Sequence, residues 1–185
     1  MKVEGIILAA GFSKRANAFK MTLNYKGKTI IENVIDGMLP YVERITVVGG
    51  YKIENLEPVI KKYEKVQLIF NEKYEEGMFS SIKKGISTVK GEGFFLTPGD
   101  YPLIEGFVYE KLLSIKGDII IPVYNSKRGH PIFIKSSQIE KINDNKYSNL
   151  REFINDNNPS YAYVDCIGIL KDVDTMEDYK EILKY

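Results

Sequence analysis

Short, largely apolar runs alternate with segments of helical spacing through the first hundred residues, and this alternation constrains the fold more than any other feature. The apolar runs cover residues 3–9, 44–48, 66–70 and 93–96, and the helical segments between them cover 30–38, 56–63 and 80–89. This order predicts right-handed crossovers and a mostly parallel sheet with helices on both faces. Ligands of such sheets bind beyond the carboxyl ends of the strands.

Local signals support the individual elements. Thr29 and Glu32 have the spacing of a capping box, and Pro40 follows the helical segment that they begin. The apolar run 3–9 is followed by Ala10 and then by Gly11. This is expected of a central strand that is buried on both faces and leads into a loop.

The second half of the chain is less regular. It is expected to contain a helix at 105–113, a strand at 118–123, a hairpin partner at 131–134, helices near Gln138 and Leu150, a strand at 161–166 and a last helix at 176–184. No linker, low-complexity tract or internal repeat divides the chain. We therefore expect an α/β fold in which residues 1–185 form a single-domain, Rossmann-like three-layer sandwich with a mostly parallel central sheet.

Composition excludes several classes of partner. The chain has 26 basic and 25 acidic residues, so its net charge of +1 gives no bulk attraction to nucleic acid or to an anionic membrane. No apolar run approaches the roughly 18 residues of a membrane span. Cys166 is the only cysteine and lies near the apolar Val164 and Ile167, which favours a buried thiol in a cytoplasmic protein over a disulfide or a nucleophile.

The loop after the first strand gathers groups that could hold a triphosphate. Gly11 permits a tight turn, Ser13 offers a hydroxyl, and Arg15 and Lys20 supply cations together with Lys14. The segment has neither the GxGxxG nor the GxxxxGK[ST] spacing, so it is not a dinucleotide fingerprint or a P-loop. A basic surface turn after a core strand would have the same composition.

Carboxylates follow two other predicted elements. Asp100 lies between Pro98 and Pro102 at the end of the strand 93–96, where a rigidly held oxygen ligand could bind Mg²⁺, although an aspartate in a Pro-Gly turn is also common. Asp174 lies in the acidic segment 172–178 before the last helix. It could be a second metal ligand, or it could cap that helix, as could Thr175.

Two further segments are candidates. The only histidine of the chain, His130, lies between Gly129 and Pro131, where it is either structural or part of a site. Arg128 and Lys127 beside it could bind the phosphate of an acceptor. The residues from Gly77 to Ser81 begin a helix, and their hydroxyl and N–H groups could cap it or contact a base.

Taken together, these segments resemble the MobA-like nucleotidyltransferase family, in particular its branch of molybdenum cofactor cytidylyltransferases, over essentially the whole chain. The matching positions are Leu8 to Gly11, Ser13, Arg15 and Lys20; Gly77, Met78, Ser80 and Ser81; Pro98, Gly99, Asp100 and Pro102; Gly129, His130 and Pro131; and Asp172 to Asp178. Ala16 and Asn17 depart from the Met-Gly of the family loop.

The resemblance implies a fold of the nucleotidyltransferase and nucleotide-diphospho-sugar transferase type and a role for each match. Arg15, Lys20 and Asp100 would be catalytic, and Asp100 and Asp174 would hold Mg²⁺. Gly129, His130 and Pro131 would bind the acceptor. The nucleotide would be bound by Leu8, Ala9, Ala10, Gly11, Ser13, Arg15, Lys20, Ser81, Pro98 and Gly99.

The same resemblance implies the substrates. The enzyme would transfer NMP from an NTP to a small phosphorylated acceptor, the molybdenum cofactor, release pyrophosphate and contact a molybdoenzyme maturation partner transiently. CTP is favoured over GTP because the residues before Lys20 lack the acid of the guanylyl branch. Alternatives are transfer to a sugar phosphate or choline phosphate, a non-catalytic nucleotide-binding domain, and a glycosyltransferase whose D-x-D motif would be Asp172 to Asp174.

Overall fold

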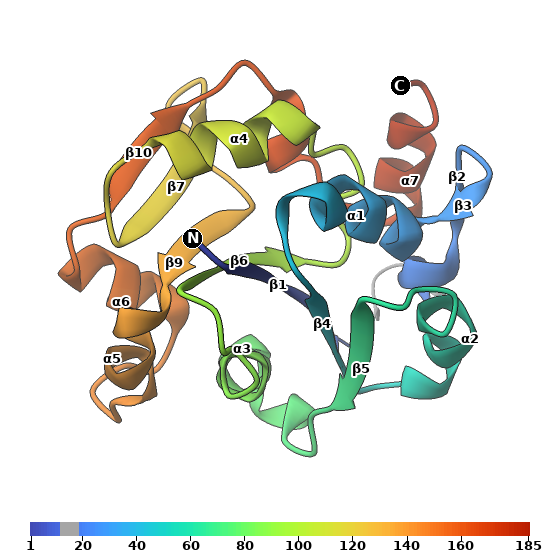
Figure 1. Ribbon diagram of the computed structural model, residues 1–185. Helices are drawn as coiled ribbons and strands as arrows, with labels where there is room; N and C mark the ends of the chain where they lie inside the picture. The colour runs from blue at the N-terminus through green and yellow to red at the C-terminus, as the bar shows by residue number, and fades with distance from the viewer. Residues whose placement is uncertain (12–18) are drawn as a thin grey trace.

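The computed structural model describes residues 1–11 and 19–185, and its centre is one twisted sheet. The strand order is β10-β7-β9-β6-β1-β4-β5 (Figure 1). The strands are β1 Val3–Ala9, β4 Ile45–Gly49, β5 Val66–Phe70, β6 Gly93–Pro98, β7 Ile119–Tyr124, β9 Ile132–Lys135 and β10 Ser160–Tyr163, and β8 Lys127–Arg128 pairs with the end of β7.

Most neighbouring strands are parallel, as the sequence predicts. β1 is parallel to β4 and β6, β4 is parallel to β5, and β10 is parallel to β7. The exceptions are β9, which lies antiparallel between β6 and β7, and the short β8, which is antiparallel to β7. The expected pairing of β9 with β7 is confirmed, and its pairing with β6 was not predicted.

Helices cover both faces of the sheet, which confirms the three-layer sandwich (Figure 1). The helices are α1 Ile30–Met38, α2 Glu57–Ile60, α3 Met78–Ile86, α4 Gly106–Ser114, α5 Ile139–Asn143, α6 Leu150–Asp156 and α7 Met176–Ile182. Residues of α1, α2 and α4 pack with Ile7 in one apolar cluster, and residues of α3, α5 and α6 pack with Ile6 and Leu8 in the other. The alternation of side chains along β1 therefore supplies both cores.

Local chemistry explains where α1 and α2 begin and end. The Oγ1 of Thr29 accepts the Glu32 N–H at 3.3 Å and the Glu32 carboxylate accepts the Thr29 N–H at 2.7 Å, so the predicted capping box is present. The helix α2 is shorter than predicted because turns replace the helical hydrogen bonds before β5. In one of these turns, the Tyr63 N–H donates to the Ile60 carbonyl.

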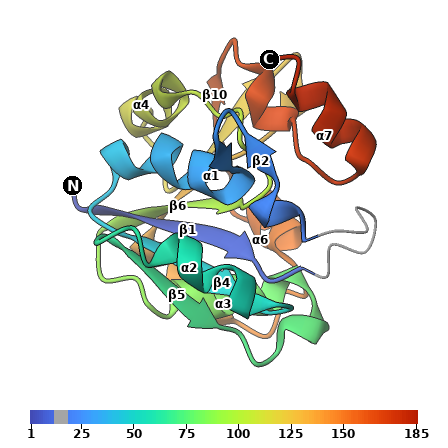
Figure 2. The same cartoon turned by 90° about the vertical axis from the view of Figure 1, so that its right-hand side faces the viewer.

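The C-terminal segment returns to the centre of the molecule. After β10, which ends earlier than predicted, the 3-10 helix Ile167–Leu170 leads back toward the sheet, and α7 lies beside the hairpin of β2 Asn24–Tyr25 and β3 Lys28–Thr29 (Figure 2). The Tyr179 hydroxyl donates to the Asn24 carbonyl at 2.6 Å across this contact. The thiol of Cys166 is buried, as expected.

Within the described ranges, no helix combines the length and apolarity that crossing a membrane would require.

Candidate active site

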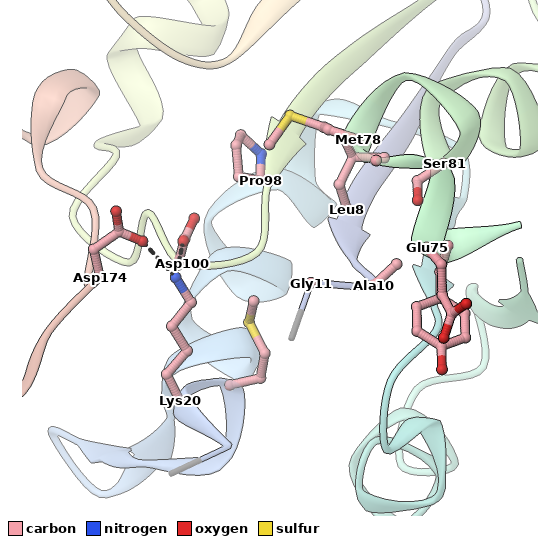
Figure 3. Close-up of a pocket in the computed structure, with 13 residues that line it drawn as sticks. Leu8, Ala10, Gly11, Lys20, Glu75, Met78, Ser81, Pro98, Asp100 and Asp174 are labelled. Carbon is pink, nitrogen blue, oxygen red and sulfur yellow. Dashed lines mark hydrogen bonds and ion pairs between the residues drawn. The ribbon is translucent and has the colours of Figure 1, made fainter. Parts of the chain in front are cut away.

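A cavity of about 390 Å³ opens at the carboxyl ends of β1 and β6. These two strands are parallel neighbours, so both end at the same edge of the sheet. The cavity is lined by Leu8, Ala10, Gly11, Lys20, Met21, Tyr74, Glu75, Gly77, Met78, Ser81, Pro98, Asp100 and Asp174 (Figure 3). Six of the nucleotide residues implied by the resemblance and both implied metal ligands are in this set.

Three aspartates meet at one side of the cavity. Oxygen atoms of Asp100, Asp172 and Asp174 all lie within 4.8 Å of one another. Asp100 follows β6, and the Val173 N–H donates to the carbonyl of Asp100 at 3.0 Å, which holds the C-terminal segment beside it. The resemblance gave Asp172 no metal-binding role in a nucleotidyltransferase, although its spacing of two residues from Asp174 puts both side chains on one side of an extended segment.

The ammonium group of Lys20 lies between two of these carboxylates (Figure 3). Its Nζ is 2.5 Å from Asp100 Oδ2 and 2.8 Å from Asp174 Oδ1. Both Lys20 and Asp100 are 8% exposed. Burial disfavours the charge on Lys20, but the two carboxylates outweigh it and raise the pKa of Lys20, which therefore stays cationic.

The acidic cluster is only partly neutralised by this lysine. Burial raises the pKa of Asp100 above its usual value, and the Lys20 ammonium opposes this effect. Burial also raises the pKa of Asp172, with repulsion from Asp174 and Asp100 adding to it. The Oδ1 atom of Asp100 is buried and has no hydrogen-bond partner among the described residues. An unpartnered carboxylate oxygen within a group of hard oxygen donors fits a Mg²⁺ ligand set.

The other side of the cavity is built from the start of α3. Gly77 precedes the helix with a φ of +100°, a conformation that favours glycine. Ser81 is buried, and its Oγ accepts a hydrogen bond from Asn71 Nδ2 at 3.0 Å. The same amide donates to Ser80 Oγ at 2.9 Å. Asn71 thus fixes both hydroxyls, and sequence reasoning missed it, although a polar residue directly after β5 was an available signal.

A second cavity of about 670 Å³ lies next to the first, and Met78 lines both. Gly129 and His130 line it together with Arg128, between α3, α6 and the strands β7 and β9. Arg128 donates to Asn155 Oδ1 at 3.0 Å and to the Tyr161 hydroxyl. Pro131 is buried and, like Lys127, is not among the residues that line the second cavity.

His130 lines the second cavity and packs against the residue that follows Asp100. The backbone N–H of His130 donates to the Ile169 carbonyl at 3.0 Å, and its ring meets the ring of Tyr101, the neighbour of Asp100, edge-on at a centroid distance of 5.0 Å. Burial lowers the pKa of His130 to about 4, against a weaker opposing effect of a hydrogen bond to the backbone of Leu96. The imidazole is therefore neutral near pH 7, and its buried Nδ1 has no hydrogen-bond partner among the described residues.

The remaining candidates fall outside the cavities or outside the described residues. Ser13 and Arg15, together with Ala16 and Asn17, lie in the segment 12–18, which the structure does not describe. Ala9 is buried in the sheet, where it pairs with Gly49. The N–H of Gly99 donates to the Leu8 carbonyl at 2.8 Å, which fixes the strand ends that carry the site.

Comparisons with known proteins agree with this architecture. A family model described as the MobA-like NTP transferase domain matches residues 5–160. A molybdenum cofactor cytidylyltransferase of Escherichia coli strain K12 is 30% identical over 96% of this chain and 93% of its own length. A probable molybdenum cofactor guanylyltransferase of Bacillus cytotoxicus is 24% identical over 98% of this chain and 96% of its own.

The fold also recurs in solved structures. A nucleotidyl transferase from Methanothermobacter thermautotroptrophicus superimposes with a TM-score of 0.87 at 16% identity, over 99% of this chain and 96% of that one. At this identity the likeness is one of fold.

Proposed function

We propose that this chain, which belongs to the MobA-like NTP transferase family, transfers CMP from CTP to the phosphate of the molybdenum cofactor and releases pyrophosphate. The enzyme class is nucleotidyltransferase, as its relatives are named. The observation that carries the proposal is the convergence of Lys20, Asp100 and Asp174 in one cavity that Gly11, shortly after β1, also lines.

The first cavity is the proposed nucleotide site. Gly11 and the neighbouring N–H groups, with Arg15, would hold the β- and γ-phosphates, and Lys20 would reach the α-phosphate. Ser13, Ala9, Pro98 and Gly99 are the other proposed nucleotide contacts, with Leu8, Ala10 and Ser81 bordering the base. The acceptor oxygen would attack the α-phosphorus in line, so that positioning and charge stabilisation carry catalysis.

Asp100 and Asp174 are the proposed ligands of Mg²⁺. When bound there, the metal would neutralise charge on the phosphates as pyrophosphate leaves. The buried Asp100 Oδ1 without a hydrogen-bond partner among the described residues supports this assignment.

The second cavity is the proposed acceptor site, with Gly129 and His130 in its wall and Pro131 supporting them. Met78 lines both this cavity and the nucleotide site, and this proximity supports the assignment because the two substrates must meet. Arg128, which has hydrogen bonds to neutral groups, provides a cation for an acceptor phosphate.

CTP is the proposed donor because the segment before Lys20 lacks an acidic residue and because the 30% identical relative is named a cytidylyltransferase. We further propose that residues 1–185 act as one catalytic domain, in the cytoplasm, and that the product passes to a molybdoenzyme maturation partner by transient contact. Nucleic acid and membrane are not proposed as partners, given the net charge of +1.

The decisive experiment measures pyrophosphate release with CTP, GTP, ATP and UTP against molybdopterin, sugar phosphates and choline phosphate. We expect release with CTP and molybdopterin, and a loss of at least about 100-fold in Asp100→Asn because a charge-stabilising group is removed. Glu57→Gln, which makes the same chemical change on the exposed side of α2, should retain full activity.

Other outcomes would select other functions. Activity restricted to a sugar phosphate or choline phosphate would exclude the molybdenum cofactor as acceptor. Tight nucleotide binding without pyrophosphate release would indicate a binding domain. Preferential hydrolysis of a nucleotide sugar would indicate a glycosyltransferase.

A further inference from the structure

We propose that Lys20 occupies the cation position of the Asp100, Asp172 and Asp174 cluster until a divalent ion displaces it, and that Asp172 is a third ligand of that ion. The inference rests on the proposed function in that it concerns the same carboxylates. It goes further because it assigns Asp172 as a ligand of the divalent ion. It also states that Lys20 and the divalent ion cannot occupy the three-aspartate cluster at the same time.

The contacts of Lys20 place it as a substitute for a bound cation. Its Nζ contacts Asp100 Oδ2 at 2.5 Å and Asp174 Oδ1 at 2.8 Å, and its side chain is only 10% exposed. These are the two carboxylates that would hold the metal. A lysine buried against both is an internal counter-ion of the site.

Lys20 satisfies the cluster incompletely. Among the described residues, three carboxylates face one ammonium group, and Lys20 forms ion pairs with Asp100 and Asp174 but not with Asp172. The Oδ1 of Asp100, a residue that is 8% exposed, is itself buried and has no hydrogen-bond partner among the described residues. A divalent ion offers twice the charge and accepts up to six oxygen ligands, so it could use this atom together with Asp172.

The two cations cannot share the position. Mg²⁺ binds oxygen at about 2.0–2.1 Å, so an ion held by Asp100 and Asp174 would fill the space where Nζ now lies, and like charges would repel. The four-carbon stem of lysine rotates freely enough for Nζ to leave while Cα stays in place. Gly11 and Lys20 line the same cavity, so Nζ would turn toward the phosphate side of the site.

Such an exchange links cation binding to nucleotide binding. Without nucleotide, a divalent ion must displace Lys20 from its two carboxylates, which weakens its binding. A bound triphosphate would draw Lys20 toward its own negative charge, so each ligand should raise the affinity of the protein for the other.

The test measures Mn²⁺ binding to the full chain without nucleotide, by the electron paramagnetic resonance signal of free Mn²⁺. We expect Lys20→Met to bind Mn²⁺ about tenfold or more tightly, because it removes a competing charge. Lys20→Arg retains the charge and should bind Mn²⁺ much as the wild type does. Lys61→Met, at an exposed lysine directly after α2, should leave affinity unchanged.

Asp172→Asn tests the third ligand in a background that keeps Lys20. We expect Mn²⁺ to bind at least about threefold more weakly, since a charged oxygen ligand becomes neutral. This variant also keeps the proposal testable if Lys20→Met does not fold, which circular dichroism would show. Unchanged affinity in Asp172→Asn, or unchanged or weaker affinity in folded Lys20→Met, would overturn the proposal.

The outcome is separable from that of the proposed function. If folded Lys20→Met binds Mn²⁺ no more tightly while the wild type still releases pyrophosphate, the exchange is wrong and the activity stands. If the affinities change as expected but no nucleotide and acceptor give pyrophosphate, the exchange stands and the activity is wrong.

Discussion

Single residues of this site hold protonation states that their surroundings impose. Lys20 stays charged although it is buried, because two carboxylates contact it. His130 is neutral near pH 7 because burial lowers its pKa to about 4. The sequence identified both residues, but their states depend on neighbours that lie far away along the chain.

The pKa of His130 predicts a pH dependence of stability. The unfolded chain takes up a proton on His130 near pH 6.5, whereas the folded protein resists it to about pH 4. Stability is therefore retained above about pH 6.5 and falls as the pH decreases toward 4, by at most about 3 kcal/mol. Urea unfolding of the wild type and of His130→Gln between pH 7 and 4 measures this effect.

Subtracting the two unfolding curves isolates His130, because it is the only histidine and the acidic groups are common to both proteins. The stability difference should change by more than about 1 kcal/mol across this range. A difference that stays constant with pH would contradict the buried, neutral imidazole.

At the scale of elements, the capping of α7 determines what Asp174 can do. Thr175 Oγ1 accepts the Asp178 N–H at 3.1 Å, and Asp178 accepts the Thr175 N–H at 2.7 Å, so Thr175 and Asp178 form the capping box. The alternative in which Asp174 is the N-cap is wrong. Asp174 contacts Lys20 instead, and its own N–H donates to Asp178 at 3.2 Å.

Two threonine variants should separate capping from cation binding. Thr175→Ala and Thr29→Ala each remove a helix cap and should each cost about 1 kcal/mol of stability. Only Thr175→Ala should also weaken Mn²⁺ binding, because the α7 cap positions Asp174 whereas α1 carries no carboxylate of the cluster. Equal Mn²⁺ affinity in the two variants would contradict this role of the α7 cap.

At the scale of the whole molecule, the segment after β10 closes the site by packing against two distant loops. The Ile169 carbonyl accepts a hydrogen bond from the backbone N–H of His130, and the backbone N–H of Val173 donates to the carbonyl of Asp100. Gly168 makes this approach possible, because a Cβ added there would overlap the carbonyl of Leu103. The position of Asp172 and Asp174 therefore depends on a glycine outside the site.

Gly168→Ala should consequently reduce both stability and cation binding. We expect a loss of more than about 2 kcal/mol in unfolding free energy, since the overlap is with backbone that cannot rotate away. Mn²⁺ affinity should fall with it. Gly37→Ala in α1, where an added Cβ would make only an ordinary contact of 3.4 Å, is the matched control and should lose neither.

The sequence predicted what depends on neighbouring residues and missed what depends on tertiary contact. The bounds of β1 and β5 and the start of α1 follow from local pattern and capping. The antiparallel position of β9 between β6 and β7 does not follow from local pattern. It depends on which strand edges are open for pairing as the sheet assembles.

The site shows the same division. Asp100, Asp174 and Lys20 were identified as candidates from their motifs, and the convergence of β1 and β6 follows from parallel topology. The ion pairs of Lys20 join residues separated by 80 and 154 positions, which no local pattern encodes. The sequence made Asp172 a candidate only for a glycosyltransferase motif, whereas in the structure its carboxylate oxygen lies within 4.8 Å of those of Asp100 and Asp174.

The order of the carboxylates along the chain has a consequence for biosynthesis. Every strand of the central sheet lies within the first 163 residues, yet two of the three clustered aspartates follow at 172 and 174. During vectorial synthesis on the ribosome, every strand of the sheet, together with Asp100, is thus made before Asp172 and Asp174 emerge. The three-aspartate cluster is among the last features that the nascent chain completes.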